Sequence, residues 1–142
     1  MTNRPIMHAT DLSRHYRQGD VTLSVLSGVN LSIEAGEKVA IVGVSGSGKT
    51  TLLNLLGGLD DADRGEVFLA EKSWHDLGAS ERAAWRNQHV GFVYQFHHLL
   101  GEFSALENVA MPLLIGSCSP TEAHHRATQL LERVGLGDRL HH

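Results

Sequence analysis

The sequence predicts an α/β fold, and the order of its segments leads to that prediction. A short β-branched run at residues 38–42 indicates a buried strand, glycine-rich residues 43–50 follow it, and strong helix formers occupy residues 51–56. Residues 66–70 and 90–94 read as further strands separated by a helix at residues 79–87, and the segment after Gln95 reads as helical. Strands that alternate with helices in this way favour an α/β architecture.

The first elements are predicted from alternation and turn chemistry. Residues 29–33 alternate apolar and polar side chains, which is the period of a half-buried strand. Residues 34–37, with the sequence Glu-Ala-Gly-Glu, have the composition of a turn, so a hairpin is expected between residues 29–33 and 38–42. Gly57 and Gly58 should end the helix at residues 51–56.

Two helices are predicted after Gln95 from their capping residues. Ser104 and Glu107 form a capping-box pattern for a helix that Pro112 should kink or end. Residues 119–122, Ser-Pro-Thr-Glu, combine an N-cap, an N1 proline and a second capping box, and Gly135 occupies the position of a left-handed C-cap. One apolar stripe of this second helix should face a core: Ala123, Ala127, Leu130, Leu131 and Val134.

Composition excludes several classes of function. The 142 residues carry a formal charge of -4, so there is no overall basic field for nucleic acid or an anionic bilayer, and no nucleic-acid partner is expected. The single cysteine, Cys118, excludes an intramolecular disulfide and fits a reducing, cytoplasmic compartment. No apolar run approaches the roughly 18 residues that span a bilayer, so any membrane association should be peripheral.

Residues 43–50 match the phosphate-binding pattern G-x-x-x-x-G-K-[ST], with the required strand before them and helix after them. Glycines let successive backbone N–H groups point inward, and the helix N-terminus adds positive potential. Lys49 can reach terminal phosphates and Thr50 offers a hydroxyl to Mg²⁺. A glycine-rich turn without a ligand is the competing interpretation. The predicted nucleotide-binding residues here are Gly43, Ser45, Gly46, Ser47, Gly48, Lys49, Thr50 and Thr51.

Beyond this loop, the chain resembles the ATP-binding subunits of ABC transporters from Leu12 to Leu140. Tyr16 lies where that family places an adenine-stacking aromatic, and residues 90–95, Val-Gly-Phe-Val-Tyr-Gln, look like the strand that leads into its Q-loop glutamine. The resemblance implies a P-loop NTPase fold with an antiparallel β subdomain, a RecA-like core and the start of a helical subdomain. It also implies ATP and Mg²⁺ as ligands, and catalytic roles for Lys49 and Gln95, with Gln95 near Mg²⁺ or the attacking water. The competing interpretations are hairpin packing for Tyr16 and a polar strand end for Gln95.

Within the family, residues 87–100 and 103–114 are similar to the ATPase of the bacterial lipoprotein-releasing system, and Phe96-His97-His98 is the most telling part. ATPases of macrolide exporters and of the cell-division ABC system share the stretch at residues 105–109 and stay open as alternatives. Gly101 stands where a proline is usual. The resemblance implies a homodimer of ATP-binding subunits at the cytoplasmic face of the inner membrane. Transmembrane subunits are expected to contact Phe96, His97 and His98, for which solvated loop residues are the competing interpretation.

Residues 1–142 are expected to form a partial domain. About residues 1–95 would make the β subdomain and Walker A core, and about residues 96–142 the Q-loop and helical subdomain. By the resemblance, the signature sequence, the Walker B aspartate, the catalytic glutamate, the switch histidine and central strands of the sheet are all expected to lie outside the chain. Two other functions stay open: a non-catalytic fragment with weak or no nucleotide binding, and a small-molecule kinase, which should carry an arginine-rich lid after Gln95.

Overall fold

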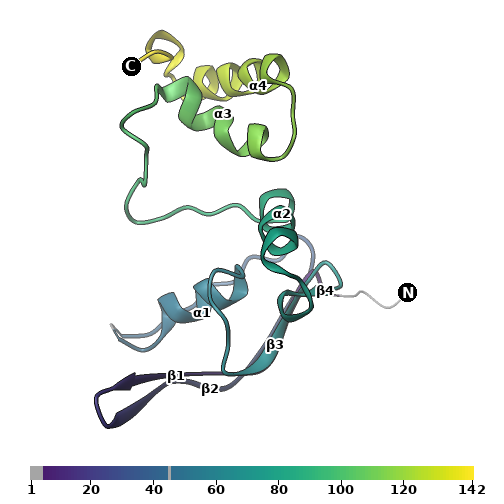
Figure 1. Cartoon of the computed structure of the whole chain (residues 1–142), viewed down its shortest axis with the longest axis vertical. Helices are drawn as coiled ribbons and strands as arrows, with labels where there is room; N and C mark the ends of the chain where they lie inside the picture. Colours follow the sequence, from purple (N-terminus) through teal and green to yellow (C-terminus); the bar gives the residue numbers. More distant parts are fainter. Residues whose placement is uncertain (1–4, 45) are drawn as a thin grey trace. The chain divides into compact units, whose positions relative to one another are not determined.

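The computed structural model describes residues 5–44 and 46–142. The chain forms two compact units, one ending at His89 and the other spanning Val90–His142. Strands occur in the first unit, and the second is built from helices and loops (Figure 1). None of the helices in the described ranges is both long and apolar enough to cross a bilayer.

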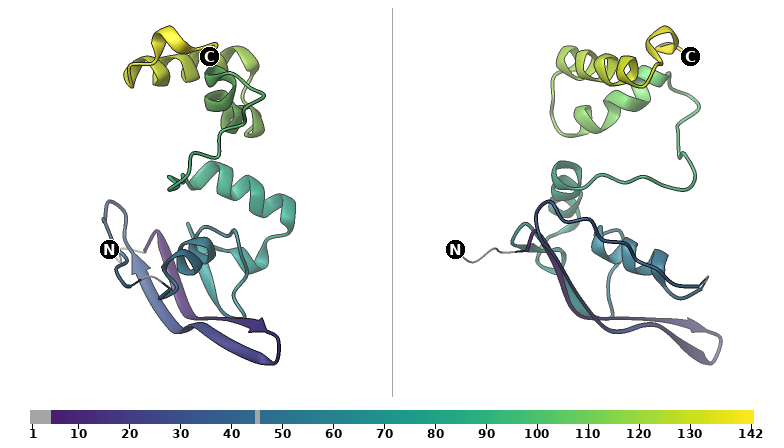
Figure 2. Two further views of the ribbon diagram at one scale, coloured as in Figure 1. Left: turned by 90° about the vertical axis from the view of Figure 1, so that its left-hand side faces the viewer. Right: turned by 180° about the vertical axis from the view of Figure 1, so that it is seen from behind.

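The first unit contains a four-stranded antiparallel sheet in the order β2-β1-β3-β4. Its strands are β1 (Met7–Gln18), β2 (Val21–Ile33), β3 (Arg64–Leu69) and β4 (Lys72–Ser73). β1 and β2 form a long hairpin that turns at Gly19, whose φ of 66° suits a glycine (Figure 2). The predicted strand at residues 66–70 is thereby confirmed as β3.

The helices of the first unit are α1 (Lys49–Leu56), the 3₁₀ turn η1 (Trp74–Asp76) and α2 (Ala79–His89). They confirm the helices predicted at residues 51–56 and 79–87. α1 packs against β2, and the buried apolar side chains come from the sheet, from one face of α1 and from η1. These side chains are Ala9, Leu12, Leu26, Leu52, Leu55, Leu56, Val67, Leu69 and Trp74. Burial of this face holds α1 to the sheet, because apolar side chains gain by leaving water.

The hairpin predicted between residues 29–33 and 38–42 is wrong, as are the strands predicted at residues 38–42 and 90–94. A turn does form, with the Glu37 amide donating to the Glu34 carbonyl at 3.1 Å, but residues 38–42 and 90–94 pair with no strand in the described ranges. Val42 and Val93 are 87% and 102% exposed. A β-branched run becomes a strand only where a neighbouring strand pairs with it, and residues 29–33 pair upstream with β1 instead.

The second unit packs α3 (Ala105–Ile115) against α4 (Pro120–Arg133), followed by the 3₁₀ turn η2 (Gly137–Arg139). Its small core is Ala110 on α3 against alanines of α4, with Leu106, Val109, Leu113 and Cys118 around them. The capping box of α3 is confirmed: the Ser104 hydroxyl accepts from the Glu107 amide at 3.2 Å, and the Glu107 carboxylate accepts from the Ser104 amide at 2.9 Å.

Two expectations for these helices need correction. Pro112 does not end α3, which continues to Ile115, and the Gly116 amide donates to the Pro112 carbonyl at 3.0 Å; the expected kink stays a prediction. In α4 the buried stripe is narrower than predicted: Ala123, Ala127 and Leu131 are buried, whereas Leu130 and Val134 are 50% and 69% exposed. α3 covers only the narrow face that the alanines define.

The C-cap predicted for α4 is confirmed. Gly135 has a φ of 82°, its amide donates to the Glu132 carbonyl at 3.0 Å, and the Leu136 amide donates to the Leu131 carbonyl at 2.8 Å. These two bonds make a Schellman motif, which glycine favours because the left-handed conformation costs it little.

Candidate nucleotide-binding site

The glycine-rich loop lies between residue 42 and α1, and two of its glycines have left-handed backbone. Gly46 and Gly48 have φ values of 82° and 93°. A Cβ on Gly48 would lie 3.0 Å from the Val25 carbonyl oxygen, so only glycine lets the loop approach β2 this closely. The loop is therefore seated directly on the strand beside α1.

The amides of the first turn of α1 lack hydrogen-bond acceptors within the helix. Gly48 is the N-cap and supplies no side-chain hydrogen bond, and no acidic side chain lies in this turn. The amides of Lys49, Thr50 and Thr51 have no acceptor within the helix, because the first N–H groups of any helix lack one. Together with the helix dipole, they make this end of α1 suitable for an anion.

A hollow of about 420 Å³ opens at this end of α1. Its walls are Val25, Gly46, Gly48, Lys49, Thr50 and Thr51. The Lys49 ammonium donates to the Gly43 carbonyl and, at 3.4 Å, to the Val44 carbonyl, so the cation sits over the loop. An ammonium has three donors on a flexible stem, which suits it to follow phosphate oxygens.

The structure brings together most of the predicted phosphate-binding residues. Gly46, Gly48, Lys49, Thr50 and Thr51 line the hollow. Gly43 and Ser47 shape the loop instead: the Ser47 amide donates to the Val44 carbonyl at 3.1 Å, and a Cβ on Gly43 would lie 2.5 Å from the Ser47 hydroxyl oxygen. Ser45, also predicted to bind nucleotide, lies outside the described residues.

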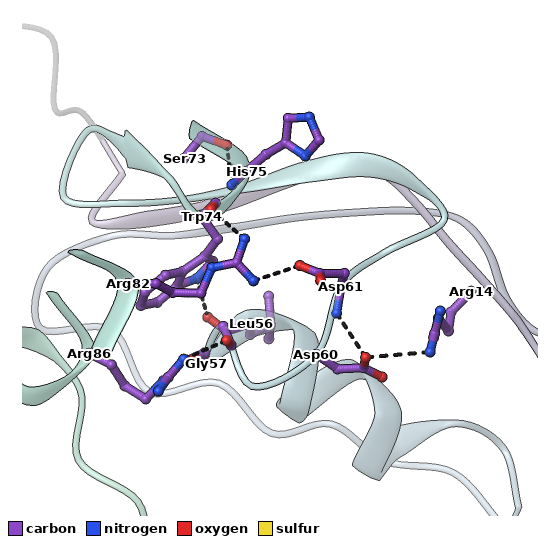
Figure 3. Close-up of polar contacts among 11 residues, drawn as sticks. Arg14, Leu56, Gly57, Asp60, Asp61, Ser73, Trp74, His75, Arg82 and Arg86 are labelled. Atoms are coloured by element: carbon purple, nitrogen blue, oxygen red, sulfur yellow. Dashed lines mark hydrogen bonds and ion pairs between the residues drawn. The ribbon is translucent and has the colours of Figure 1, made fainter. Parts of the chain in front are cut away.

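The end of α1 opposite the hollow is held by side chains from η1 and α2 (Figure 3). The Trp74 indole Nε1 donates to the Leu56 carbonyl at 3.0 Å. The Arg86 guanidinium donates to the Gly57 carbonyl at 3.1 Å and to the Gly58 carbonyl at 2.6 Å. A cation at a helix C-terminus also complements the dipole, so α1 is fixed at the end away from the phosphate loop.

Tyr16, the predicted adenine platform, lies on β1 and is 39% exposed. Its ring is packed against Arg14, whose guanidinium carbon is 4.8 Å from the ring centroid, and its hydroxyl donates to Asp60 at 3.4 Å. Tyr16 is not among the residues that line the hollow. Sequence reasoning singled out neither Arg14 nor Asp60 as a site residue, because neither belongs to a motif.

Gln95, Phe96, His97 and His98 belong to the second unit and are exposed. Phe96 is 72% exposed, the His97 ring Nδ1 accepts from the Leu99 amide at 3.0 Å, and the His98 ring lies 4.6 Å from that of Tyr94, edge to face. The roles predicted for these four residues stay predictions.

Asn108, on α3, organises the loop that follows these residues and was not singled out from the sequence. Its Oδ1 accepts from the Leu100 amide at 2.9 Å, and its Nδ2 donates to the carbonyls of Leu100, Phe103 and Ser104 at 3.1, 3.2 and 3.0 Å. One half-buried amide side chain thus satisfies four backbone groups of the loop. The available signal was an amide side chain in the first turn of the helix, directly after the capping-box residue Glu107.

No group of three or more His, Cys, Asp and Glu side chains suited to a metal ion occurs among the residues that the structure describes. The hollow could hold Mg²⁺ without such a cluster, because its lining includes the Thr50 hydroxyl and Mg²⁺ prefers oxygen ligands. Proteins commonly hold this cation with few of their own groups, and substrate phosphates supply further ligands.

The model of a known protein family, described as ABC transporter, matches residues 26–142. This match covers the glycine-rich loop, all of α1 and the whole second unit. The chain belongs to the ABC transporter family. Its P-loop NTPase fold of the ABC type, expected from the sequence, follows from this membership.

Relatives in the ABC transporter family include proteins named "Lipoprotein-releasing system ATP-binding protein LolD". The protein of Pseudomonas fluorescens is 57% identical and that of Pseudomonas syringae pv. tomato 56%, each over all 142 residues of this chain and 63% of the relative. The chain thus spans about three fifths of their length. A solved structure, the ATP-binding cassette MJ0796 bound to ADP and Pi, has a TM-score of 0.86 and 36% identity, covering 95% of this chain and 60% of that one.

A second structure of MJ0796, described as dimeric and as a bacterial ABC transporter cassette, matches with the same TM-score, identity and coverage. The small-molecule kinase and the macrolide-export and cell-division systems, left open by the sequence, are not favoured by these relatives.

Proposed function

We propose that the protein of which these residues form part binds and hydrolyses ATP to power an ABC transporter that releases lipoproteins from the bacterial inner membrane. The observation that carries the proposal is the hollow at the N-terminal end of α1, which Lys49, Thr50 and the backbone of the first helical turn line. The names and the identity of the LolD relatives support lipoprotein release as the process that is driven.

The proposed reaction is an in-line attack of water on the γ-phosphorus of ATP. A bond forms between the water oxygen and phosphorus, the bond from phosphorus to the β,γ-bridging oxygen breaks, and ADP and phosphate leave. The amides of the first α1 turn and the Lys49 ammonium stabilise negative charge on the phosphate oxygens. Thr50 would hold Mg²⁺, which when bound neutralises charge on the β- and γ-phosphates.

Further roles belong to the same proposal. Tyr16 would stack on adenine, and Gln95 would orient water or contact Mg²⁺. Phe96, His97 and His98 would meet the transmembrane subunits, a role consistent with their exposure. The whole protein would act as a homodimer at the cytoplasmic face of the membrane, which the dimeric MJ0796 structures support by analogy.

Titration calorimetry of the 142-residue chain with Mg²⁺ and ATP tests the proposal, with circular dichroism to verify folding. Lys49→Ala should abolish saturable binding, because it removes the cation at the loop. Lys38→Ala removes an exposed lysine from the turn before the loop and should leave affinity unchanged. Undiminished affinity in folded Lys49→Ala would overturn the assignment.

The alternative of a non-catalytic fragment concerns only this chain. Residues 38–44 and 90–100 include side chains that are strongly exposed, Val42, Val44, Val93, Phe96 and Leu99. Exposed apolar side chains of this kind mark interaction surfaces or make a chain prone to aggregate. Binding of ATP without turnover would favour this alternative for the chain, and turnover would exclude it.

A further inference from the structure

The ring of Tyr16 is held on one face by a cation. The Arg14 guanidinium carbon lies 4.8 Å from the ring centroid, within the range of a cation–π contact. The guanidinium therefore lies over one face of the Tyr16 ring. A base that stacks on Tyr16, which is 39% exposed, would have to meet the opposite face of the ring.

Arg14 is itself fixed by two carboxylates from the loop between α1 and β3. Its Nη1 lies 3.2 Å from Asp63 Oδ1. Its Nη2 lies 3.4 Å from Asp60 Oδ1, and Figure 3 shows this second contact. The Arg14 side chain is 22% exposed, so these ion pairs are partly shielded from water. The other oxygen of Asp60 accepts from the Tyr16 hydroxyl at 3.4 Å, so the same carboxylate contacts both the cation and the ring it covers.

The loop that carries these acids is docked on β1 through its backbone. The Asp63 amide donates to the Ser13 carbonyl at 2.9 Å, and Asp63 Oδ2 accepts from the His15 amide at 2.5 Å. Gly65 has a φ of 88°, and a Cβ there would lie 2.3 Å from the Thr10 carbonyl oxygen, so only glycine permits this approach. The position of the acids is thus set before any ligand arrives.

We infer that Arg14 is a positioning residue for base recognition: held by Asp60 and Asp63, it fixes the Tyr16 ring so that its free face receives the purine of a nucleoside triphosphate. The inference rests on the proposed function, since it assumes that Tyr16 meets the base. A ring that is already held in place loses less side-chain freedom on stacking, so Arg14 strengthens binding of the base without touching the phosphates.

The test compares two probes on the 142-residue chain, Mg–ATP and Mg–tripolyphosphate, by titration calorimetry. Tripolyphosphate reports on the phosphate loop alone, and the ratio of the two dissociation constants reports on the base. Arg14→Ala should weaken ATP binding about three-fold and leave tripolyphosphate binding unchanged, because the Tyr16 ring loses the cation–π contact that holds it. Tyr16→Ala should weaken ATP binding about ten-fold through loss of base stacking.

Three further variants separate positioning from a general effect on the hairpin. In the Tyr16→Ala background, Arg14→Ala should have no added effect, because the ring it positions is gone. Arg14→Lys keeps a cation and should restore part of the lost affinity. Arg17→Ala, an exposed arginine on the same strand, is the matched control and should leave both probes unchanged.

The inference about Arg14 and the proposed nucleotide site can fail separately. The inference would be overturned if Arg14→Ala lowered the affinity for ATP and for tripolyphosphate equally. It would also be overturned if Arg14→Ala lowered the ATP affinity by the same factor in the Tyr16→Ala background. Either result would leave the proposed nucleotide site intact. An unchanged ATP affinity in folded Arg14→Ala would likewise overturn the inference and leave that site intact. Failure of the unchanged chain to bind either probe would overturn the proposed function, and the inference with it.

Discussion

The indole nitrogen of Trp74 donates a hydrogen bond to the carbonyl oxygen of Leu56, the last residue of α1, at 3.0 Å. Trp74 is 5% exposed, and its ring lies so close to Gly58 that a Cβ there would meet it at 2.5 Å. The tryptophan thus fills the space behind α1 and satisfies one of the carbonyls that a helix end leaves without a partner. The same helix carries the phosphate loop at its other end, so a side chain distant from the candidate site helps to fix it.

Trp74→Phe should lower the free energy of unfolding by about 1–2 kcal/mol, because it keeps an aromatic ring but leaves the buried Leu56 carbonyl without its donor. Urea denaturation followed by far-UV circular dichroism measures this loss. Trp85→Phe is the matched comparison: its indole donates to the Leu69 carbonyl at 3.1 Å, but Trp85 is only half-buried, so water can replace the bond. Equal losses in the two variants would contradict the role assigned to Trp74.

The helices and their caps could be predicted from the sequence because their determinants are local. The Ser104–Glu107 capping box and the Gly135 C-cap involve residues within a few positions of each other. The phosphate loop is predictable for the same reason, since residues 43–50 contain both the glycines and the lysine.

Features that join distant segments were missed. The strand predicted at residues 38–42 failed because pairing depends on a neighbour that the local sequence does not reveal. Arg14 meets Asp60 and Asp63 across 46 and 49 residues of chain, and Trp74 meets Leu56 across 18. No short motif encodes such contacts, so the support of Tyr16 and of α1 became visible only in the fold.

Asn108→Ala should loosen the loop at residues 100–104, because the Asn108 side chain bonds four of its backbone groups. We expect the Leu100 amide, which donates to Asn108 Oδ1 at 2.9 Å, to exchange its hydrogen about five-fold faster in the variant, the equivalent of one ordinary hydrogen bond. Hydrogen exchange followed by NMR measures it. The Gly116 amide, bonded to the Pro112 carbonyl, is an internal reference that should not change, and equal acceleration of both amides would indicate general unfolding instead.

Glu107 should make the stability of α3 sensitive to acid. The Ser104 amide donates to the Glu107 carboxylate at 2.9 Å, and this bond lowers the pKa of Glu107 below its ordinary value. Because the pKa is lower in the folded than in the unfolded chain, the stabilisation is complete above the unfolded value of about 4.3 and is lost as the pH falls through the folded value.

The capping box therefore predicts that α3 melts more readily as the pH is lowered from about 5 to about 3, and that Glu107→Gln flattens this part of the profile. Glu102→Gln, which removes another exposed negative charge from the preceding loop, controls for the change in net charge. Thermal melts followed by circular dichroism across this range measure the effect. If Glu107→Gln kept the slope of the unchanged chain, Glu107 and its hydrogen bond from Ser104 would not be the source of the acid sensitivity.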